Sequence, residues 1–171
     1  FKEGVFDKHG KWMDGWETRR KRKKGHDYLI LKLGRPGKIH KVDIDTSYFN
    51  GNQPSKVSLD ACYSKNKLAN KNSKWINILK KSTTKPNSHH FFNIKNKSIF
   101  THVKLNIYPD GGVARIRIYG NMKINKQFGK KVINLTSVLN GASPIACNNE
   151  HFGRAENILA PGVGKNMGDG W

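Results

Sequence analysis

Hydrophobic and polar residues alternate through the middle of the chain, which is the pattern of β-strands with one buried face. In residues 100–108, Val103, Leu105 and Ile107 fall on one face, and polar side chains fall on the other. Residues 113–119 repeat this pattern, with Ile116 and Ile118 on the apolar face. Further strands are predicted at residues 28–33, 39–45, 56–61, 75–79 and 90–94, each bounded by glycine, proline, asparagine or serine.

The segment Pro109 to Gly112 (PDGG) separates the two strongest strands and holds the residue types that make tight reversals. We therefore predict that residues 100–108 and 113–119 form a β-hairpin. Helix signals are scarce, and one short helix is predicted at residues 134–139, ended by Asn140 and Gly141. About seven short strands with little helix predict an all-β fold, either a β-sandwich or a jelly roll.

A repeated motif bears on the domain organisation. Gly10 to Trp16 (GKWMDGW) returns as Gly164 to Trp171 (GKNMGDGW) after one inserted residue. Copies that lie a domain length apart indicate tandem duplication of a whole domain rather than a solenoid. In a chain of 171 residues, we expect residues 1–150 to form one repeat and residues 151–171 to begin a second.

The formal charge of +20 would ordinarily favour a nucleic-acid partner. Here the lysines are scattered and alternate with asparagines, as in residues 65–67 (KNK), so we interpret most of them as solvated surface residues. Nucleic acid is therefore not the expected partner. The exception is the continuous basic run Arg19 to Lys24 (RRKRKK).

Two further observations bear on the compartment. The longest apolar stretches are interrupted by lysine within a few positions, so no segment is predicted to span a membrane. The two cysteines, Cys62 and Cys147, form no C-x-x-C pair and lack histidines at zinc-finger spacing. A chain with only two cysteines, in no recognised motif, favours a reduced, intracellular protein. A cytoplasmic protein is therefore expected, with the peroxisome as the alternative location.

The densest group of chemically active residues lies between positions 14 and 27. Trp16, Glu17, Arg19, Arg20 and His26 crowd into this segment. Arginine forks bind carboxylates through two hydrogen bonds, so Arg19 and Arg20 are predicted to hold a small carboxylate. A solvated basic loop, with the acidic residues as local counter-ions, is the alternative.

Two more groups come from the predicted strands. Asp43 and Asp45 share one face at the end of a strand, where paired carboxylates serve as acid and base or bind a divalent cation. A turn capped by these side chains is the alternative. Asn106 and Arg115 fall on the polar side of the predicted hairpin, and Asp110 falls at its tip. Packing on a solvated sheet face explains that group equally well.

The longer strings that contain these groups resemble the allantoicase family. They are residues 10–27 (GKWMDGWETRRKRKKGHD), 42–52 (VDIDTSYFNGN), 100–120 (FTHVKLNIYPDGGVARIRIYG) and 151–171 (HFGRAENILAPGVGKNMGDGW). The resemblance implies an enzyme of two repeats, each a jelly-roll β-sandwich similar to galactose-binding domains. It also implies that the counterpart of residues 151–161 is missing ahead of Phe1.

The resemblance implies a hydrolase that converts allantoate to ureidoglycolate and urea in purine degradation. This reaction needs an anion clamp, hydrogen bonds to ureido groups and a proton donor. We assign Arg19, Arg20 and Arg115 to the clamp and Glu17 or His26 to proton transfer. Either Asp43 or Asp45 would orient water or a metal, while Trp16, Asn106 and Asp110 would contact the substrate.

The expected partners are a small ureide substrate and further copies of the chain in a homo-oligomer. The histidines show no trustworthy metal spacing, so the cofactor is left open, with a divalent metal as the candidate. Jelly rolls also serve as binding modules without catalysis. An inactive module that binds anionic ligands or polyanions is therefore the alternative function.

Overall fold

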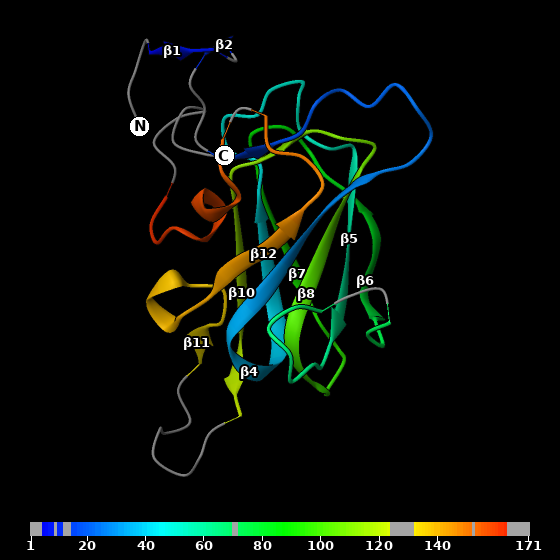
Figure 1. Ribbon diagram of the computed structural model, residues 1–171, viewed down its shortest axis with the longest axis vertical. Coiled ribbons are helices and arrows are strands. Elements are labelled where there is room, and N and C mark those ends of the chain that lie inside the picture. The colour runs from blue at the N-terminus through cyan, green and yellow to red at the C-terminus, as the bar shows by residue number, and fades with distance from the viewer. Residues whose placement is uncertain are drawn as a thin grey trace.

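The computed structural model describes residues 5–8, 10–11, 15–69, 72–123, 132–151 and 153–163, and the protein is nearly all β (Figure 1). The strands are β1 (Phe6–Asp7), β2 (Gly10–Lys11), β3 (Trp16–Glu17), β4 (Asp27–Asp45), β5 (Lys56–Cys62), β6 (Ile76–Thr83), β7 (His89–Asn93), β8 (Ile99–Tyr108), β9 (Gly112–Val113), β10 (Arg115–Met122), β11 (Ile133–Asn134) and β12 (Ser143–Cys147). Two short 3-10 helices, η1 (Val138–Asn140) and η2 (Ala155–Leu159), complete the described elements.

Strand β4 organises the fold because it belongs to both layers. Its first part pairs with β8 and β12, and its second part pairs with β10 and β7. The pairing with β8 shifts register between Lys32 and Gly37, around the sequence Gly34-Arg35-Pro36. Figure 1 shows the chain descending through the first part, turning at the lower end and returning upward. The two strands predicted at residues 28–33 and 39–45 are thus one bent strand of 19 residues.

Hydrogen bonding is continuous through β4, but the bend divides the strands into two layers. One layer has the order β12, β4, β8, β5 and β6, and the other has the order β11, β10, β4 and β7. Neighbouring strands in both layers are antiparallel. The predicted all-β jelly-roll sandwich is confirmed.

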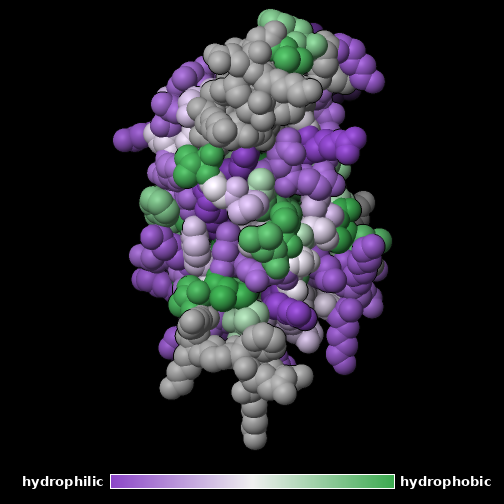
Figure 2. All heavy atoms as spheres, turned by 90° about the vertical axis from the view of Figure 1, so that its left-hand side faces the viewer, coloured by the Kyte–Doolittle hydropathy of each residue, from purple (hydrophilic) through white to green (hydrophobic). Residues whose placement is uncertain are grey.

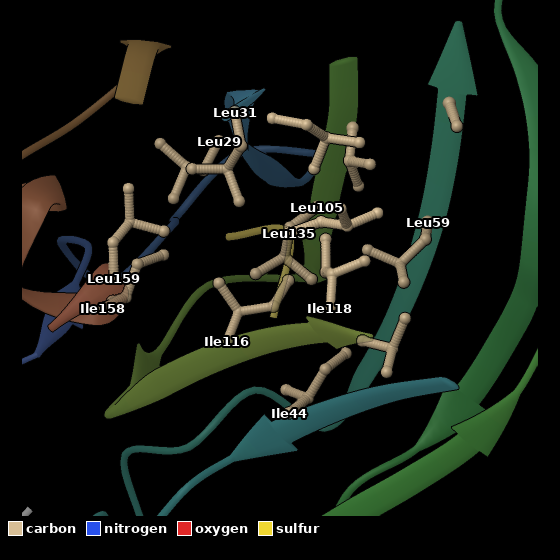
Figure 3. Packing of buried hydrophobic residues seen from close by; sticks show 14 of the residues in the cluster. Leu29, Leu31, Ile44, Leu59, Leu105, Ile116, Ile118, Leu135, Ile158 and Leu159 are labelled. Atoms are coloured by element: carbon tan, nitrogen blue, oxygen red, sulfur yellow. The ribbon is translucent and has the colours of Figure 1, made fainter. Parts of the chain in front are cut away.

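The core lies between the layers and is built from the apolar face of each strand (Figure 3). Leu29, Leu59 and Leu105 meet in register across β4, β5 and β8, and all three are fully buried. Ile116 and Ile118 face them from the other layer. Burial of each such side chain contributes about 1.5–3 kcal/mol, which is why the alternation of residue types predicts these strands well. The apolar faces expected for residues 100–108 and 113–119 are confirmed.

The predicted hairpin is wrong. Strand β8 pairs with β4 and β5, whereas β10 pairs with β4 and β11, so these two strands lie in opposite layers. Residues 109–114 cross from one layer to the other, and on the way β9 pairs with β3. Both strands alternate in the way that a hairpin requires, but each finds its partner in β4 instead. Consequently the polar sides of β8 and β10 lie on opposite faces of the sandwich.

The predicted helix at residues 134–139 is reduced to the single turn η1. Leu135 is buried in the core, and its N–H donates to the carbonyl of Ile118 at 2.7 Å. Thr136 Oγ1 donates to the carbonyl of Ile116 at 3.2 Å. These bonds hold residues 135–136 against β10 as a turn that follows β11, so the helical conformation is limited to residues 138–140. Gly141 ends the turn with φ of 80°, so the predicted left-handed ending is confirmed.

The surface mixes residue types. Figure 2 shows the side that carries β11 and β12, where hydrophobic residues form separate patches among hydrophilic ones. Exposed large hydrophobic residues come from several elements and include Phe6, Leu68, Phe91, Leu139 and Val163. Within the described ranges, no helix is long and apolar enough to cross a membrane.

The described residues hold only part of the repeated motif. Residues 12–14 of the first copy and all of the second copy, residues 164–171, lie outside them. Residues just before the second copy are described, and Ala155, Ile158 and Leu159 of η2 belong to the same core as the strands. Residues 155–159 therefore pack on the same sandwich as the strands that precede them.

Candidate functional site

A cavity of about 540 Å³ lies where three segments meet beside the ends of β3, β4 and β8. The segments are residues 17–20, 51–55 and 109–111, and His151 adds a fourth wall. The lining residues are Glu17, Thr18, Arg19, Arg20, Gly51, Asn52, Gln53, Ser55, Pro109, Asp110, Gly111 and His151. The cavity thus brings together four residues that the sequence predicts as site residues. They come from two separate segments and are Glu17, Arg19, Arg20 and Asp110.

A short antiparallel pairing fixes two of these segments. Trp16 lies opposite Val113, and Glu17 lies opposite Gly112. Beyond the strands, the N–H of Thr18 donates to the carbonyl of Gly111 at 3.1 Å. Trp16 is fully buried, and its Nε1 donates to the carbonyl of Asn149 at 2.9 Å. Trp16 therefore anchors this segment in the core, and it is not among the described lining residues of the cavity.

Two glycines allow the loops to approach each other closely. A Cβ atom on Gly112 would lie 1.9 Å from the buried ring of Phe49, and the N–H of Gly112 donates to the carbonyl of Asn52 at 2.7 Å. Gly111 has φ of 134°, and a Cβ atom there would lie 2.5 Å from the backbone nitrogen of Pro54. Only glycine permits both contacts. These contacts place the side chains of Asn52 and Asp110 at the same cavity.

Glu17 is the buried carboxyl group of the cavity. Asn52 Nδ2 donates to Oε1 of Glu17 at 2.8 Å. Burial raises the pKa of Glu17 above its ordinary value, the hydrogen bond from Asn52 opposes this effect, and the charge of Asp110 adds to it. A carboxyl group whose pKa is raised stays protonated at higher pH, so Glu17 is suited to donate a proton.

Arg19 and Arg20 are exposed and line the same cavity. Arg19 Nε donates to Nδ1 of His151 at 3.2 Å, which orients this guanidinium. Exposed guanidinium groups at a cavity edge bind carboxylates through paired, charge-assisted hydrogen bonds. The cavity therefore combines two cationic groups for an anion with a buried acid beside them.

Asp110 is held from the opposite loop. The backbone N–H of Lys21 donates to its Oδ2 at 2.6 Å. Lys21 Nζ in turn lies 2.5 Å from Oδ1 of Asp27, which also accepts from Asn148 Nδ2 at 2.6 Å. The basic run thus has local counter-ions, and it also lines a second cavity of about 350 Å³ with Asn148 and Asn149.

Asp43 and Asp45 lie elsewhere, on the outer face of the other layer. They share one face of β4, as the alternation predicts, yet their exposed fractions are only 2% and 0%. Arg117 Nη1 contacts Asp43 Oδ2 at 3.1 Å and Asp45 Oδ2 at 3.2 Å, and His89 Nδ1 lies 2.9 Å from Asp43 Oδ2. Asp43, His89 and Arg117 line a separate cavity of about 440 Å³. The two aspartates thus have a shared cationic partner.

His26 and Asn106 form a third group on the outer face of the layer that contains β5 and β8. His26 Nε2 and Asn106 Oδ1 are 3.2 Å apart, and Asn106 Nδ2 donates to Asp60 Oδ2 at 2.9 Å. The rings of His26 and Tyr108 are in contact, with centroids 4.6 Å apart and planes tilted by 33°. None of these four residues belongs to the described lining of the 540 Å³ cavity.

Arg115 is buried on β10, where it pairs in register with Asp45. Its Nη1 donates to the carbonyl of Ala114 at 2.7 Å. The structure therefore brings Arg19 and Arg20 together but places Arg115 outside the described lining of their cavity. This separation follows from the crossing of residues 109–114 between the layers, which sends the polar side of β10 away from β8.

Sequence patterns missed Asn52 and His151. Asn52 belongs to the string at residues 42–52, and the nearby Gly51, with φ of 94°, marks a turn. The turn indicates a loop but does not show what the loop contacts. His151 stands 132 positions from Arg19 in the chain, and no local pattern connects them. Both residues are recognised only when the fold brings their segments together.

Metal-ligand clusters and reactive thiols are two other kinds of reactive group that the described residues could hold. No group of three or more His, Cys, Asp or Glu side chains is placed there to hold a metal ion. Both cysteines are free, and burial raises the pKa of Cys62 to about 11 and that of Cys147 to about 12. Thiols with such pKa values remain protonated near neutral pH and are poor nucleophiles.

Comparison with known proteins points in the same direction as the fold and the cavity. Residues 2–123 match the family model described as the allantoicase repeat. Probable allantoicases from Photobacterium profundum, Acinetobacter baumannii and Pseudomonas fluorescens are 50%, 50% and 49% identical over 173, 171 and 178 residues. Each alignment covers 100% of this chain but 52%, 51% and 52% of the relative.

Solved structures agree. The crystal structure of allantoicase from Saccharomyces cerevisiae is 38% identical, with a TM-score of 0.56 over 66% of this chain and 33% of that chain. A second allantoicase structure gives the same identity and TM-score over 67% and 34%. The fold and cavity define a β-sandwich protein with a charged pocket suited to a small anion. The chain belongs to the allantoicase family, and it spans about half the length of the curated relatives named above.

Proposed function

We propose that this chain forms a substrate pocket of an allantoicase, an enzyme that hydrolyses allantoate to ureidoglycolate and urea in purine degradation. The observation that carries the proposal is the 540 Å³ cavity, where Arg19 and Arg20 stand beside the buried carboxyl group of Glu17. Membership of the allantoicase family supports the choice of substrate. The substrate class is therefore a small carboxylate that bears ureido groups.

The proposed roles follow from the chemistry of the substrate. Allantoate has one carboxylate and two ureido groups on a single carbon, and the reaction expels one urea. Arg19 and Arg20 hold the carboxylate, and the protonated Glu17 donates a proton to the departing ureido nitrogen. Asn52 keeps Glu17 in place through the 2.8 Å hydrogen bond. Arg115 lies outside the described lining of the cavity, so its place in the clamp stays a prediction.

The position of the two predicted proton donors supports the choice of Glu17 over His26. Glu17 lines the cavity together with the arginines, whereas His26 contacts the ring of Tyr108 and lies 3.2 Å from Oδ1 of Asn106. A proton donor must reach the reacting atom within hydrogen-bond distance. This requirement favours Glu17. Asp43 and Asp45 do not line this cavity, so we assign them no role in it, and their predicted role in orienting water or a metal stays a prediction.

The test is urea release from allantoate by the purified protein, measured with added divalent metal and again with a chelator. We expect stoichiometric urea and ureidoglycolate. Comparison of the two conditions decides whether a metal takes part. If the folded protein releases no urea under either condition, the proposed function is wrong, and an anion-binding module without catalysis replaces it.

Three broader expectations are proposals as well. Residues 151–171 are proposed to begin a second repeat, which is supported by the return of the motif at residues 164–171 and by the greater length of the relatives. A cytoplasmic location is proposed on the basis of two free thiols. A homo-oligomer is proposed without a mapped interface, and light scattering on the purified protein would measure it.

A further inference from the structure

The proposed reaction needs a base as well as an acid, and the structure holds a second carboxylate in the same cavity. Hydrolysis adds water to the central carbon, so a proton must leave the water oxygen as the bond to nitrogen breaks. The aspartates predicted for this task, Asp43 and Asp45, are paired with Arg117 around a different cavity. Of the described residues that line the arginine cavity, Glu17 and Asp110 carry carboxyl groups.

We propose that Asp110 is the general base that takes a proton from the attacking water, opposite the proton donor Glu17. This inference rests on the proposed function and assigns Asp110 a step in the reaction, in place of the substrate contact that the sequence suggests. The proton of water moves to Asp110, and the water oxygen bonds to the central carbon. The bond between that carbon and one ureido nitrogen breaks, and the nitrogen takes the proton of Glu17. Solvent returns the proton from Asp110 to Glu17 after the products leave.

The loop contacts fix Asp110 in position for this step. Its Oδ2 accepts the N–H of Lys21 at 2.6 Å, and among the described hydrogen bonds its Oδ1 accepts none. The adjacent Gly111 is bonded to Thr18 in both directions, through its carbonyl at 3.1 Å and through its N–H at 3.3 Å. One oxygen is therefore held by the protein while the other is available to water. The hydrogen bond to the Asp110 side chain and the bonds to the adjacent Gly111 fix the position of this carboxyl group, so it is preorganised for proton transfer.

The two carboxyl groups have different surroundings, which is how one site obtains an acid and a base. Glu17 is buried, and Asp110 is partly exposed at the cavity wall. The charged and titratable groups that face Asp110 are Glu17 from β3, Arg19, Arg20 and the Lys21 backbone from the following segment, and His151 from the opposite wall. The charge of Asp110 favours the protonated form of Glu17.

The test is to measure the steady-state kinetics of urea release from allantoate by the wild-type protein and by its Asp110→Asn variant. Asparagine keeps the shape of the side chain and an oxygen for Lys21, but it is not a base. We expect kcat to fall by about 10²–10⁴-fold, while KM for allantoate changes by less than about threefold. A general base must be ionised to act, so the wild-type rate should fall at acidic pH and the variant should lack this acidic limb.

A second variant guards against a merely structural effect. Asp110→Ala leaves room for an external carboxylate, and added formate should restore part of its rate while leaving the wild-type rate unchanged. An increase in KM with kcat within about threefold of wild type would show that Asp110 only binds the substrate, and the inference would then be wrong. Loss of kcat without formate rescue and with an unchanged acidic limb would also overturn it. Failure of the proposed function is distinct, because the wild-type protein would then release no urea.

Discussion

At the scale of residues, the cavity shows how burial separates carboxyl groups that have similar chemistry. Glu17 is buried beside an amide, whereas Asp43 is buried beside Arg117 and His89. Burial favours the protonated form of Glu17 although the hydrogen bond from Asn52 opposes it, whereas the guanidinium of Arg117 lies beside Asp43. Burial alone therefore does not identify a proton donor. The partner of the carboxyl group decides which chemistry it can perform.

The raised pKa of Glu17 predicts the alkaline side of the pH profile. Because the donor must be protonated, kcat should fall as the pH rises through the pKa of Glu17, which lies above its ordinary value. Glu17→Gln should lower kcat by about 10²–10⁴-fold and remove this alkaline limb. The measurement is kcat for urea release across a pH series, with Glu156→Gln on the exposed side of η2 as the control. An alkaline limb that persists in Glu17→Gln would assign proton transfer to another residue.

The buried thiols predict slow alkylation of the native protein. With pKa values of about 11 for Cys62 and about 12 for Cys147, the thiolate fraction near pH 8 is about a hundredfold or more below that of an ordinary cysteine. Iodoacetamide should therefore modify both residues quickly only after unfolding in guanidinium chloride. Mass spectrometry of the labelled peptides measures this difference. Rapid labelling of either cysteine in the native protein would contradict its raised pKa.

Sequence patterns located part of the site at this scale. Glu17, Arg19 and Arg20 were predicted because oppositely charged residues crowd into one short segment, and such crowding is visible without a fold. Asn52 and His151 were missed because a lone amide or histidine has no local signature. Their roles depend on loop contacts between distant segments, such as the bond between Gly112 and Asn52.

At the scale of elements, strand positions were predictable but strand pairing was not. Alternation over residues 100–108 reports which side chains are buried, and this depends only on the local sequence. Pairing depends on where the chain turns, and β4 can pair with both β8 and β10 because it bends near Gly37. The helix predicted at residues 134–139 failed for a similar reason, since Leu135 and Thr136 form a turn that is hydrogen-bonded to β10.

The contact between two loops gives a prediction at this scale. A Cβ atom on Gly112 would lie 1.9 Å from the ring of Phe49, and the buried ring has little room to move. Gly112→Ala should lower the free energy of unfolding by about 1–3 kcal/mol and weaken substrate binding, because Asn52 must shift with the loop. Denaturant unfolding measures the first effect.

The control for this variant is Gly51→Asn, at a position with φ of 94° where a Cβ atom would meet nothing within 4 Å. Asparagine tolerates left-handed backbone, so this variant should lose less than about 1 kcal/mol. Equal losses in the two variants would mean that the approach of Gly112 to Phe49 does not matter for stability.

At the scale of the whole molecule, the bent strand β4 brings the site together. Both ends of this strand pair with neighbours whose own ends carry the cavity loops, since Asp27 lies opposite Ile107 and Asp45 lies opposite Arg115. The loops that precede β4, follow β4 and connect β8 to β10 therefore meet at one end of the sandwich. A β-sandwich was predictable from the count and spacing of strands. The bend that assembles the site became visible only in the structure.

The claim that this cavity binds a ureido carboxylate can be tested directly by calorimetry with hydantoate, an unreactive carboxylate that bears one ureido group. Arg19→Ala and Arg20→Ala should each weaken binding by about 10- to 100-fold, the cost of losing a charge-assisted hydrogen bond. Arg22→Ala removes the same charge from the basic run but does not line this cavity, and it should change affinity by less than about twofold. Equal losses in all three variants would contradict the account, because the anion would then be attracted by the basic run as a whole.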